Sequence, residues 1–136
     1  MKKITPITKK REIYSDFFSD FTENPVSSDL ARKTNEDSVK ESIRNLIFTN
    51  KGERLFQPEI GGNVQKILFE NINPSTVITL KESIKELIIN YEPRANLIDV
   101  DVISNIDDNF IKIIIVFGVI NNSEEITLVQ TIDRVR

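Results

Sequence analysis

Carboxylates carry most of the chemistry that this sequence could perform, because it contains no histidine and no cysteine. The usual general base at neutral pH, thiol chemistry and the commonest transition-metal ligands are therefore missing. A glycosidase would need two carboxylates about 5 to 9.5 Å apart, one of them with a raised pKa. The candidates are Glu53, Glu59, Glu70, Glu92, Asp99, Asp101, Asp107 and Asp108.

The number of carboxylates does not by itself indicate an active site. A chain with 21 acidic residues contains many accidental pairs, and it has no tryptophan and few tyrosines to form a sugar-stacking surface. We therefore expect no catalytic residue, and we keep a hydrolase as the alternative.

Two short motifs resemble ligand sites but have simpler interpretations. Asp107-Asp108-Asn109 looks like part of a calcium loop, yet the spacing and terminal glutamate of an EF-hand are missing, so a hairpin turn is favoured. Gly61-Gly62 precedes a helix start, as in anion-binding loops, but no preceding strand and no phosphate-loop signature accompany it. The sequence thus predicts no metal site and no cofactor.

A charged triplet interrupts the stretch NYEPRANLI, residues 90–98. Pro93 ends the preceding helix, and Glu92 then lies at a helix C-terminus, where the macrodipole disfavours an anion. One interpretation is local: Glu92 is solvated and Arg94 is a C-terminal cation. The other is that Glu92 and Arg94 project from a rigid corner and pair with groups on a partner.

Composition predicts one soluble globular domain without a membrane span. The chain has 136 residues, of which 39% are hydrophobic and 29% charged, and no apolar run approaches the ~20 residues of a membrane helix. The N-terminal MKKITPITKKREIY lacks the apolar core of a secretory signal, so synthesis in the cytoplasm is expected. A net charge of −3 argues against nucleic acid, and we interpret Lys9-Lys10-Arg11 as a solvated tail.

The elements that position these residues follow from hydrophobic periodicity. Residues 1–33 show no helical period, and their aromatics predict an extended arm packed on the body or on a neighbouring subunit, with a turn at Asn24-Pro25. An amphipathic helix is expected from Thr34 or Asn35 to about residue 50, with an apolar stripe of Val39, Ile43, Leu46 and Ile47. A short helix is expected over about 63–70. The intervening loop is expected to be anchored by Leu55, Phe56 and Ile60.

The clearest helix begins with Asn73 as N-cap and Pro74 in the first turn. Its apolar stripe consists of Val77, Leu80, Ile84, Leu87, Ile88 and Tyr91. Strands are predicted at about 97–102, with Ile98 inward, at 110–120, covered on both faces, and at 126–132. This is an α+β fold with an arm at 1–33 and one domain at 34–136, whose small antiparallel sheet of three strands has open edges.

A longer set of landmarks covers about residues 40–103. It reads SIRNLIFTNKGERLFQPEIGGNVQKILFENINPSTVITLKESIKELIINYEPR and continues into LIDVDV. This text resembles the baseplate wedge and sheath-initiator proteins of contractile-tailed phages, the family named after the phage W protein and often labelled lysozyme-like. The upstream IYSDFFSDFTENPVSSDLARKTNEDSVK is similar to the T-even and cyanophage branch.

The resemblance implies a structural role in the virion, in several copies around a six-fold tail, with no enzymatic activity. Implied partners are other wedge subunits, the tail sheath protein and the hub and tube proteins, with neither nucleic acid nor membrane. Family members present a sheath-interlocking-like domain on which the first sheath ring polymerises by strand exchange. Their Glu-Pro-Arg triplet contacts the wedge core, which implies Glu92, Pro93 and Arg94 as partner-binding residues. The lysozyme label leaves peptidoglycan hydrolysis as the alternative.

Replacing either charge of the triplet should leave the isolated fold nearly intact. We expect Glu92→Ala or Arg94→Ala to change stability by no more than ~0.5 kcal/mol. The same variants should block incorporation into the wedge.

Overall fold

The computed structural model describes residues 12–69, 73–105, 110–120 and 124–133. Three of the features discussed above, Lys9-Lys10-Arg11, Glu70 and Asp107-Asp108-Asn109, lie outside these residues. The chain divides into two compact units, Met1–Ser38 and Val39–Arg136. The division falls within the first helix, α1 (Asn35–Phe48).

The first unit contains a small hairpin. Strand β1 (Ser15–Phe17) pairs antiparallel with β2 (Arg32–Thr34), and the predicted turn at Asn24-Pro25 is confirmed, because the Val26 N–H donates to Asn24 Oδ1 at 2.9 Å. Part of the predicted extended arm therefore pairs with itself. Within this unit Phe21 remains 67% exposed.

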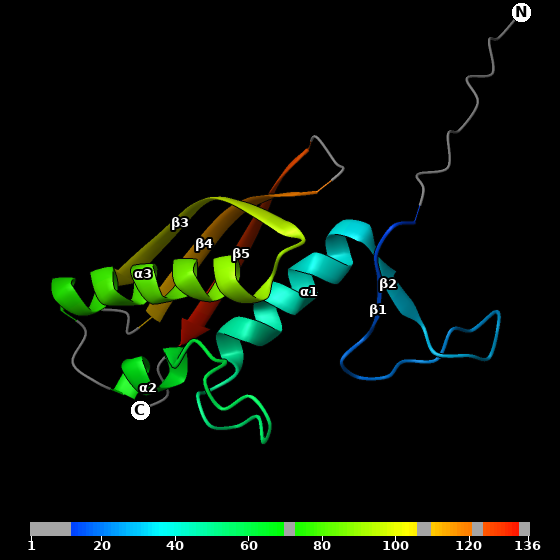
Figure 1. Cartoon of the computed structure of the whole chain (residues 1–136), viewed down its shortest axis with the longest axis horizontal. Helices are drawn as coiled ribbons and strands as arrows, with labels where there is room; N and C mark the ends of the chain where they lie inside the picture. Colours follow the sequence, from blue (N-terminus) through cyan, green and yellow to red (C-terminus); the bar gives the residue numbers. More distant parts are fainter. Residues whose placement is uncertain (1–11, 70–72, 106–109, 121–123, 134–136) are drawn as a thin grey trace, which may run out of the picture. The chain divides into compact units, whose positions relative to one another are not determined.

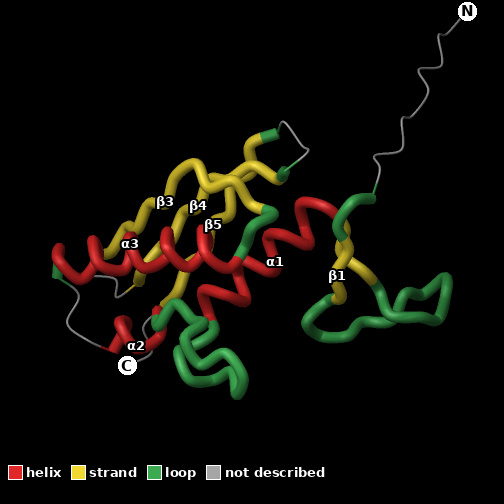
Figure 2. Tube along the Cα trace, in the orientation of Figure 1, coloured by secondary structure: helices red, strands yellow, loops and turns green. Residues whose placement is uncertain are grey.

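The second unit begins with the rest of α1, whose predicted apolar stripe is buried. The short helix α2 (Val64–Phe69) follows a loop of residues 49–63, drawn in green in Figure 2, which we call the α1–α2 loop. Ile60 anchors this loop and is 4% exposed, in a buried cluster with Leu46 and Leu87. Leu55 and Phe56 do not anchor it, since they point into solvent, so the prediction was wrong for these two residues.

Helix α3 (Pro74–Tyr91) begins as its sequence predicts. The Asn73 side chain accepts a hydrogen bond from the Thr76 N–H at 2.8 Å, and Pro74 occupies the first turn, where a missing N–H is harmless. The helix packs along β3 (Ala95–Asn105), as Figure 1 shows. Its buried side chains are Leu80, Ile84, Leu87 and Ile88.

Strands β3, β4 (Phe110–Val119) and β5 (Glu125–Asp133) form an antiparallel meander in the order β3-β4-β5. Val100 lies opposite Ile115, and Val102 lies opposite Ile113, and all four side chains are buried. The α+β fold class is therefore confirmed, with three helices and a three-stranded antiparallel sheet among the described residues.

Two strand predictions need correction. Residues of β4 alternate between buried and half-buried, so the strand is fully covered on one face rather than on both. The pairing of β3 shifts register between Leu97 and Asp99, and this bulge leaves Ile98 50% exposed. A bulge adds one unpaired residue to a strand, which displaces it from the inward alternation.

Candidate functional site at the end of helix α3

The triplet Glu92-Pro93-Arg94, called the corner below, joins α3 to β3. The Glu92 N–H still donates to Ile88 O at 2.9 Å, but Pro93 has no N–H to continue the helix. The Ala95 N–H then donates to Glu92 O at 3.1 Å and closes a turn. At the far side of the corner, the Ile120 N–H donates to Arg94 O at 3.0 Å, which ties it to the end of β4.

The two charges of the corner pair with each other. Arg94 Nε donates to Glu92 Oε1 at 2.7 Å, and Arg94 Nη2 donates to Glu92 Oε2 at 2.9 Å. The Glu92 side chain is only 2% exposed, whereas that of Arg94 is 28% exposed. Bidentate, charge-assisted bonds of this kind are stronger and more directional than neutral ones. The guanidinium therefore bridges a buried carboxylate and the solvent.

A further partner of Glu92 comes from another helix. The Ser42 hydroxyl, on α1, hydrogen-bonds the same carboxylate. Burial raises the pKa of Glu92, but the hydrogen bonds from Arg94 and Ser42 and the positive charge of Arg94 outweigh it, so its pKa lies below the ordinary 4.5. Glu92 is thus held ionised at the junction of α1, α3 and β3.

This geometry changes part of what the sequence predicts. A solvated Glu92 is excluded by its burial. The expectation that Glu92→Ala and Arg94→Ala behave as surface changes is excluded with it, because Arg94 pairs with this buried carboxylate. The cation that compensates Glu92 is supplied by Arg94 within the chain. Sequence reasoning missed Ser42 as a partner of Glu92. The one available signal was its position beside Ile43, a residue of the apolar stripe of α1. Contact of the corner with a partner remains a prediction.

Two other candidate carboxylates, Glu53 and Asp101, each pair with a different neighbour. Glu53 accepts hydrogen bonds from the backbone and side chain of Asn50, and Asp101 lies 3.6 Å from Lys81 Nζ. Asn50 also lowers the pKa of Glu53, first through its backbone N–H. A general acid needs a raised pKa, and both candidate carboxyl groups with a shifted pKa, Glu53 and Glu92, shift downward.

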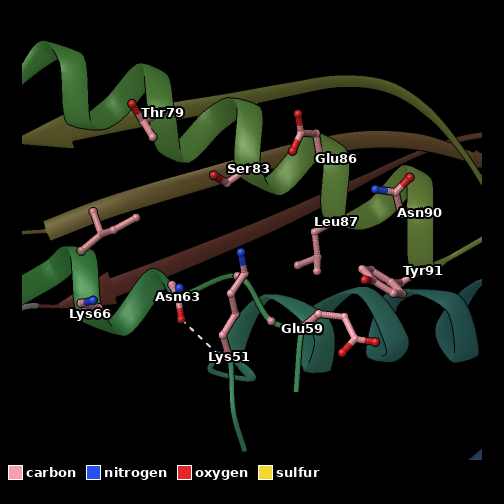
Figure 3. Close-up of a pocket in the computed structure, with 13 residues that line it drawn as sticks. Lys51, Glu59, Asn63, Lys66, Thr79, Ser83, Glu86, Leu87, Asn90 and Tyr91 are labelled. Atoms are coloured by element: carbon pink, nitrogen blue, oxygen red, sulfur yellow. Dashed lines mark hydrogen bonds between the residues drawn. The ribbon is translucent and has the colours of Figure 1, made fainter. Parts of the chain in front are cut away.

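A pocket of about 470 Å³ lies between α3, α2 and the α1–α2 loop. Figure 3 shows Ser83, Glu86 and Asn90 projecting from α3 on one side, with Lys51 and Lys66 on the other. Glu59 also lines it, so the pocket contains two carboxylates and two ammonium groups. It is a polar pocket with mixed charge, in contrast to the largely apolar sites that bind most small molecules.

Neither a membrane helix nor a metal cluster is found in the described part of the chain. None of its helices combines the length and apolar character needed to cross a bilayer. Within the same residues, no three acidic side chains are grouped as metal ligands would be.

Comparisons with known proteins give a consistent family. The model of the family described as "Baseplate wedge protein gp25" matches residues 33–124. The protein of that name from Enterobacteria phage T4 is 36% identical over 104 residues, which are 76% of this chain and 79% of the relative.

Two solved structures have the same fold. A crystal structure of a putative tail lysozyme from Geobacter sulfurreducens has 27% identity and a TM-score of 0.65, over 74% of this chain and 92% of that one. A chain of the anti-feeding prophage baseplate has 22% identity and a TM-score of 0.61, over 87% of this chain and 83% of that one.

Proposed function

Since the chain belongs to the family of baseplate wedge protein gp25 and has its place in a contractile-tail baseplate, we propose a non-enzymatic assembly role in two parts. The three-stranded sheet accepts a strand from the tail sheath protein and so templates the first sheath ring. The corner Glu92-Pro93-Arg94 docks onto the wedge core. The observation that carries the first part is the edge of β5, with which no strand in the described part of the chain pairs.

Strand β5 has the properties of an accepting edge. Its pairing with β4 runs without a register shift from Glu125 to Asp133, and no described strand pairs with its other side. Edge strands are normally protected by lysine, proline or a bulge, and the β5 sequence EITLVQTID contains neither lysine nor proline. A continuous row of backbone donors and acceptors suits addition of an extended segment.

The opposite edge of the sheet is better protected. Strand β3 carries a bulge between Leu97 and Asp99 and packs against α3. Asp101 alternates with the buried Val100 and Val102 and therefore faces away from the core, yet Lys81 of α3 reaches it. The Lys81 side chain must therefore extend past the edge of β3 to reach Asp101. We therefore assign the sheath strand to β5.

A charge on β5 tests this assignment. Val129 lies in the middle of β5 and is 49% exposed. Val129→Lys therefore places a positive charge on this edge strand, and such a charge disfavours strand addition. We expect normal folding and baseplate formation but at least a tenfold loss of sheathed tails, counted by electron microscopy. Ile89→Lys, at a 65% exposed position on α3, is the control. Normal sheath growth on the Val129 variant would refute the β5 assignment.

The corner offers a rigid outer surface for the wedge core. Pro93 is exposed and Arg94 is partly exposed, while Glu92 is buried behind them. In this arrangement Glu92 acts through Arg94, because it holds the guanidinium in one orientation. A preorganised contact loses less conformational entropy on binding than a mobile one.

Replacement of an exposed proline tests the corner without breaking the ion pair. Pro93→Ala should change the free energy of unfolding by no more than about 1 kcal/mol. It should lower incorporation of the protein into wedges about tenfold, measured by pull-down of co-expressed wedge proteins. Pro74→Ala, at an exposed proline that starts α3, is the matched control. Equal incorporation of both variants would argue against docking through the corner.

Peptidoglycan hydrolysis is the competing function. It is favoured by the name of the Geobacter sulfurreducens structure and by the presence of Glu59 and Glu86 in one pocket. Clearing of cell-wall substrate by the purified protein, abolished by Glu59→Gln or Glu86→Gln, would replace the assembly role. We expect no clearing.

A further inference from the structure

The α1–α2 loop exposes two large apolar side chains at its tip. Leu55 is 91% exposed and Phe56 is 96% exposed, whereas Ile60 in the same loop is 4% exposed. Adjacent exposed leucine and phenylalanine side chains leave substantial apolar area in water, which is unfavourable in the free protein. We call Leu55 and Phe56 the apolar tip.

Hydrogen bonds across the loop hold this tip in place. The Gly52 N–H donates to Pro58 O at 2.8 Å, and the Gly62 N–H donates to Thr49 O at 3.0 Å. Side chains reinforce these bonds: the Lys51 N–H donates to Asn63 Oδ1 at 3.1 Å.

Asn50 joins two further parts of the loop region. Its Nδ2 donates to Glu53 Oε1 at 2.7 Å and to Gln65 Oε1, on α2, at 3.1 Å. These bonds fix the loop on both sides of the apolar tip, so the exposure of Leu55 and Phe56 is a property of an ordered loop.

Close backbone packing fixes the base of the loop. A Cβ atom on Gly61 would lie 2.6 Å from Thr49 O, and one on Gly62 would lie 2.7 Å from Ile47 O. Gly61 also has a φ of 151°, which other residues rarely adopt. The two ends of the loop therefore approach each other more closely than side chains allow, and the tip projects from a rigid base.

We propose that this loop is a docking knob that inserts Leu55 and Phe56 into an apolar pocket on another baseplate subunit. The proposal rests on the assembly role proposed above and adds a contact distinct from the corner and from β5. A rigid apolar centre with charged neighbours, Glu53 and Arg54, matches the anatomy of protein interfaces, in which a few buried side chains carry most of the affinity.

Other binding partners fit the loop less well. A second copy of this chain would have to offer an apolar pocket, but the 470 Å³ pocket is lined mainly by charged and polar side chains. An anionic lipid surface is disfavoured by the net charge of −3. Both remain distinguishable outcomes of the experiment below.

Site-specific photocrosslinking tests the knob in the full chain. Phe56 is replaced by p-benzoylphenylalanine in cells that produce tails, and the control carries the same photocrosslinker at Ile89, 65% exposed on α3. We expect position 56, and not position 89, to crosslink to one other baseplate protein, identified by mass spectrometry. A product with a second copy, with lipid, or with no partner would overturn the proposal.

A paired variant measures the contribution of the tip. Leu55→Ser/Phe56→Ser should lower incorporation into baseplates about tenfold or more, as expected for loss of an interface hot spot. The control, Ile78→Ser/Ile89→Ser, also removes two exposed apolar side chains and should incorporate normally.

The outcomes separate this proposal from the assembly role. If the unmodified chain and the tip variant both incorporate fully, the docking-knob proposal is refuted and the assembly role is not. If both double variants fail equally, general loss of apolar surface explains the effect and the knob is again refuted. If the unmodified chain is absent from baseplates, the assembly role fails and the knob fails with it.

Discussion

The corner and the α1–α2 loop reverse the usual placement of side chains. At the corner, a charged Glu92 is 2% exposed, while in the loop an apolar Phe56 is 96% exposed. Both regions are held by backbone hydrogen bonds, so neither is simply disordered. At the corner, Arg94 and Ser42 of the same chain compensate the buried charge of Glu92. In the loop, the apolar surface of Leu55 and Phe56 stays exposed to water, as expected of a surface that contacts another protein.

The largest change in stability should come from removing the cation of the corner. Arg94→Ala leaves a buried carboxylate with Ser42 and a backbone N–H as its remaining partners. Breaking a buried pair in this way costs about 3 kcal/mol, measurable as a drop in the free energy of unfolding in urea.

The double variant Glu92→Ala/Arg94→Ala is the control for that prediction. It removes the unpaired charge as well and should be more stable than Arg94→Ala. If the single variant is as stable as the wild type, the ion pair is not what holds the corner.

A smaller and pH-dependent effect should come from neutralising Glu92. Its pKa is lowered in the folded chain, so the ionised carboxylate contributes stability above its ordinary pKa of 4.5 and loses it as pH falls through the folded value. We expect Glu92→Gln to lower the free energy of unfolding by about 1 to 2 kcal/mol at neutral pH.

This difference between wild type and Glu92→Gln should shrink in more acidic buffer. Urea unfolding at several pH values below 4.5 measures it. Glu53 also has a lowered pKa, but it titrates in both proteins and cancels. A difference that stays constant with pH would show that packing, rather than charge, explains the effect.

The smallest effect on stability should come from the apolar tip. Leu55→Ser/Phe56→Ser removes side chains that are already in water, so the free energy of unfolding should change by no more than ~0.5 kcal/mol. Thermal unfolding compared with wild type measures this. A large loss of stability would mean that the tip packs within the chain, and the contrast with the corner would disappear.

Much of the second unit follows from local sequence. The apolar stripe of α1, the Asn73-Pro74 start of α3 and the three strands all appear where periodicity and capping predict them. These features depend on residues within a few positions of one another, and such neighbours share a face or a hydrogen bond by backbone geometry alone. The short pairing of β1 with β2 was missed because its strands are far apart in the sequence and only three residues long.

The amino-acid sequence by itself therefore determined the helices, the order of the strands, the family landmarks and the absence of histidine and cysteine chemistry. Tertiary structure decided which side chains meet water: it buried Glu92 beside Ser42 of a distant helix, displaced Ile98 at a bulge and left Leu55 and Phe56 exposed. Periodicity shows which residues share a face, but burial depends on what packs against that face, and those neighbours come from remote parts of the chain.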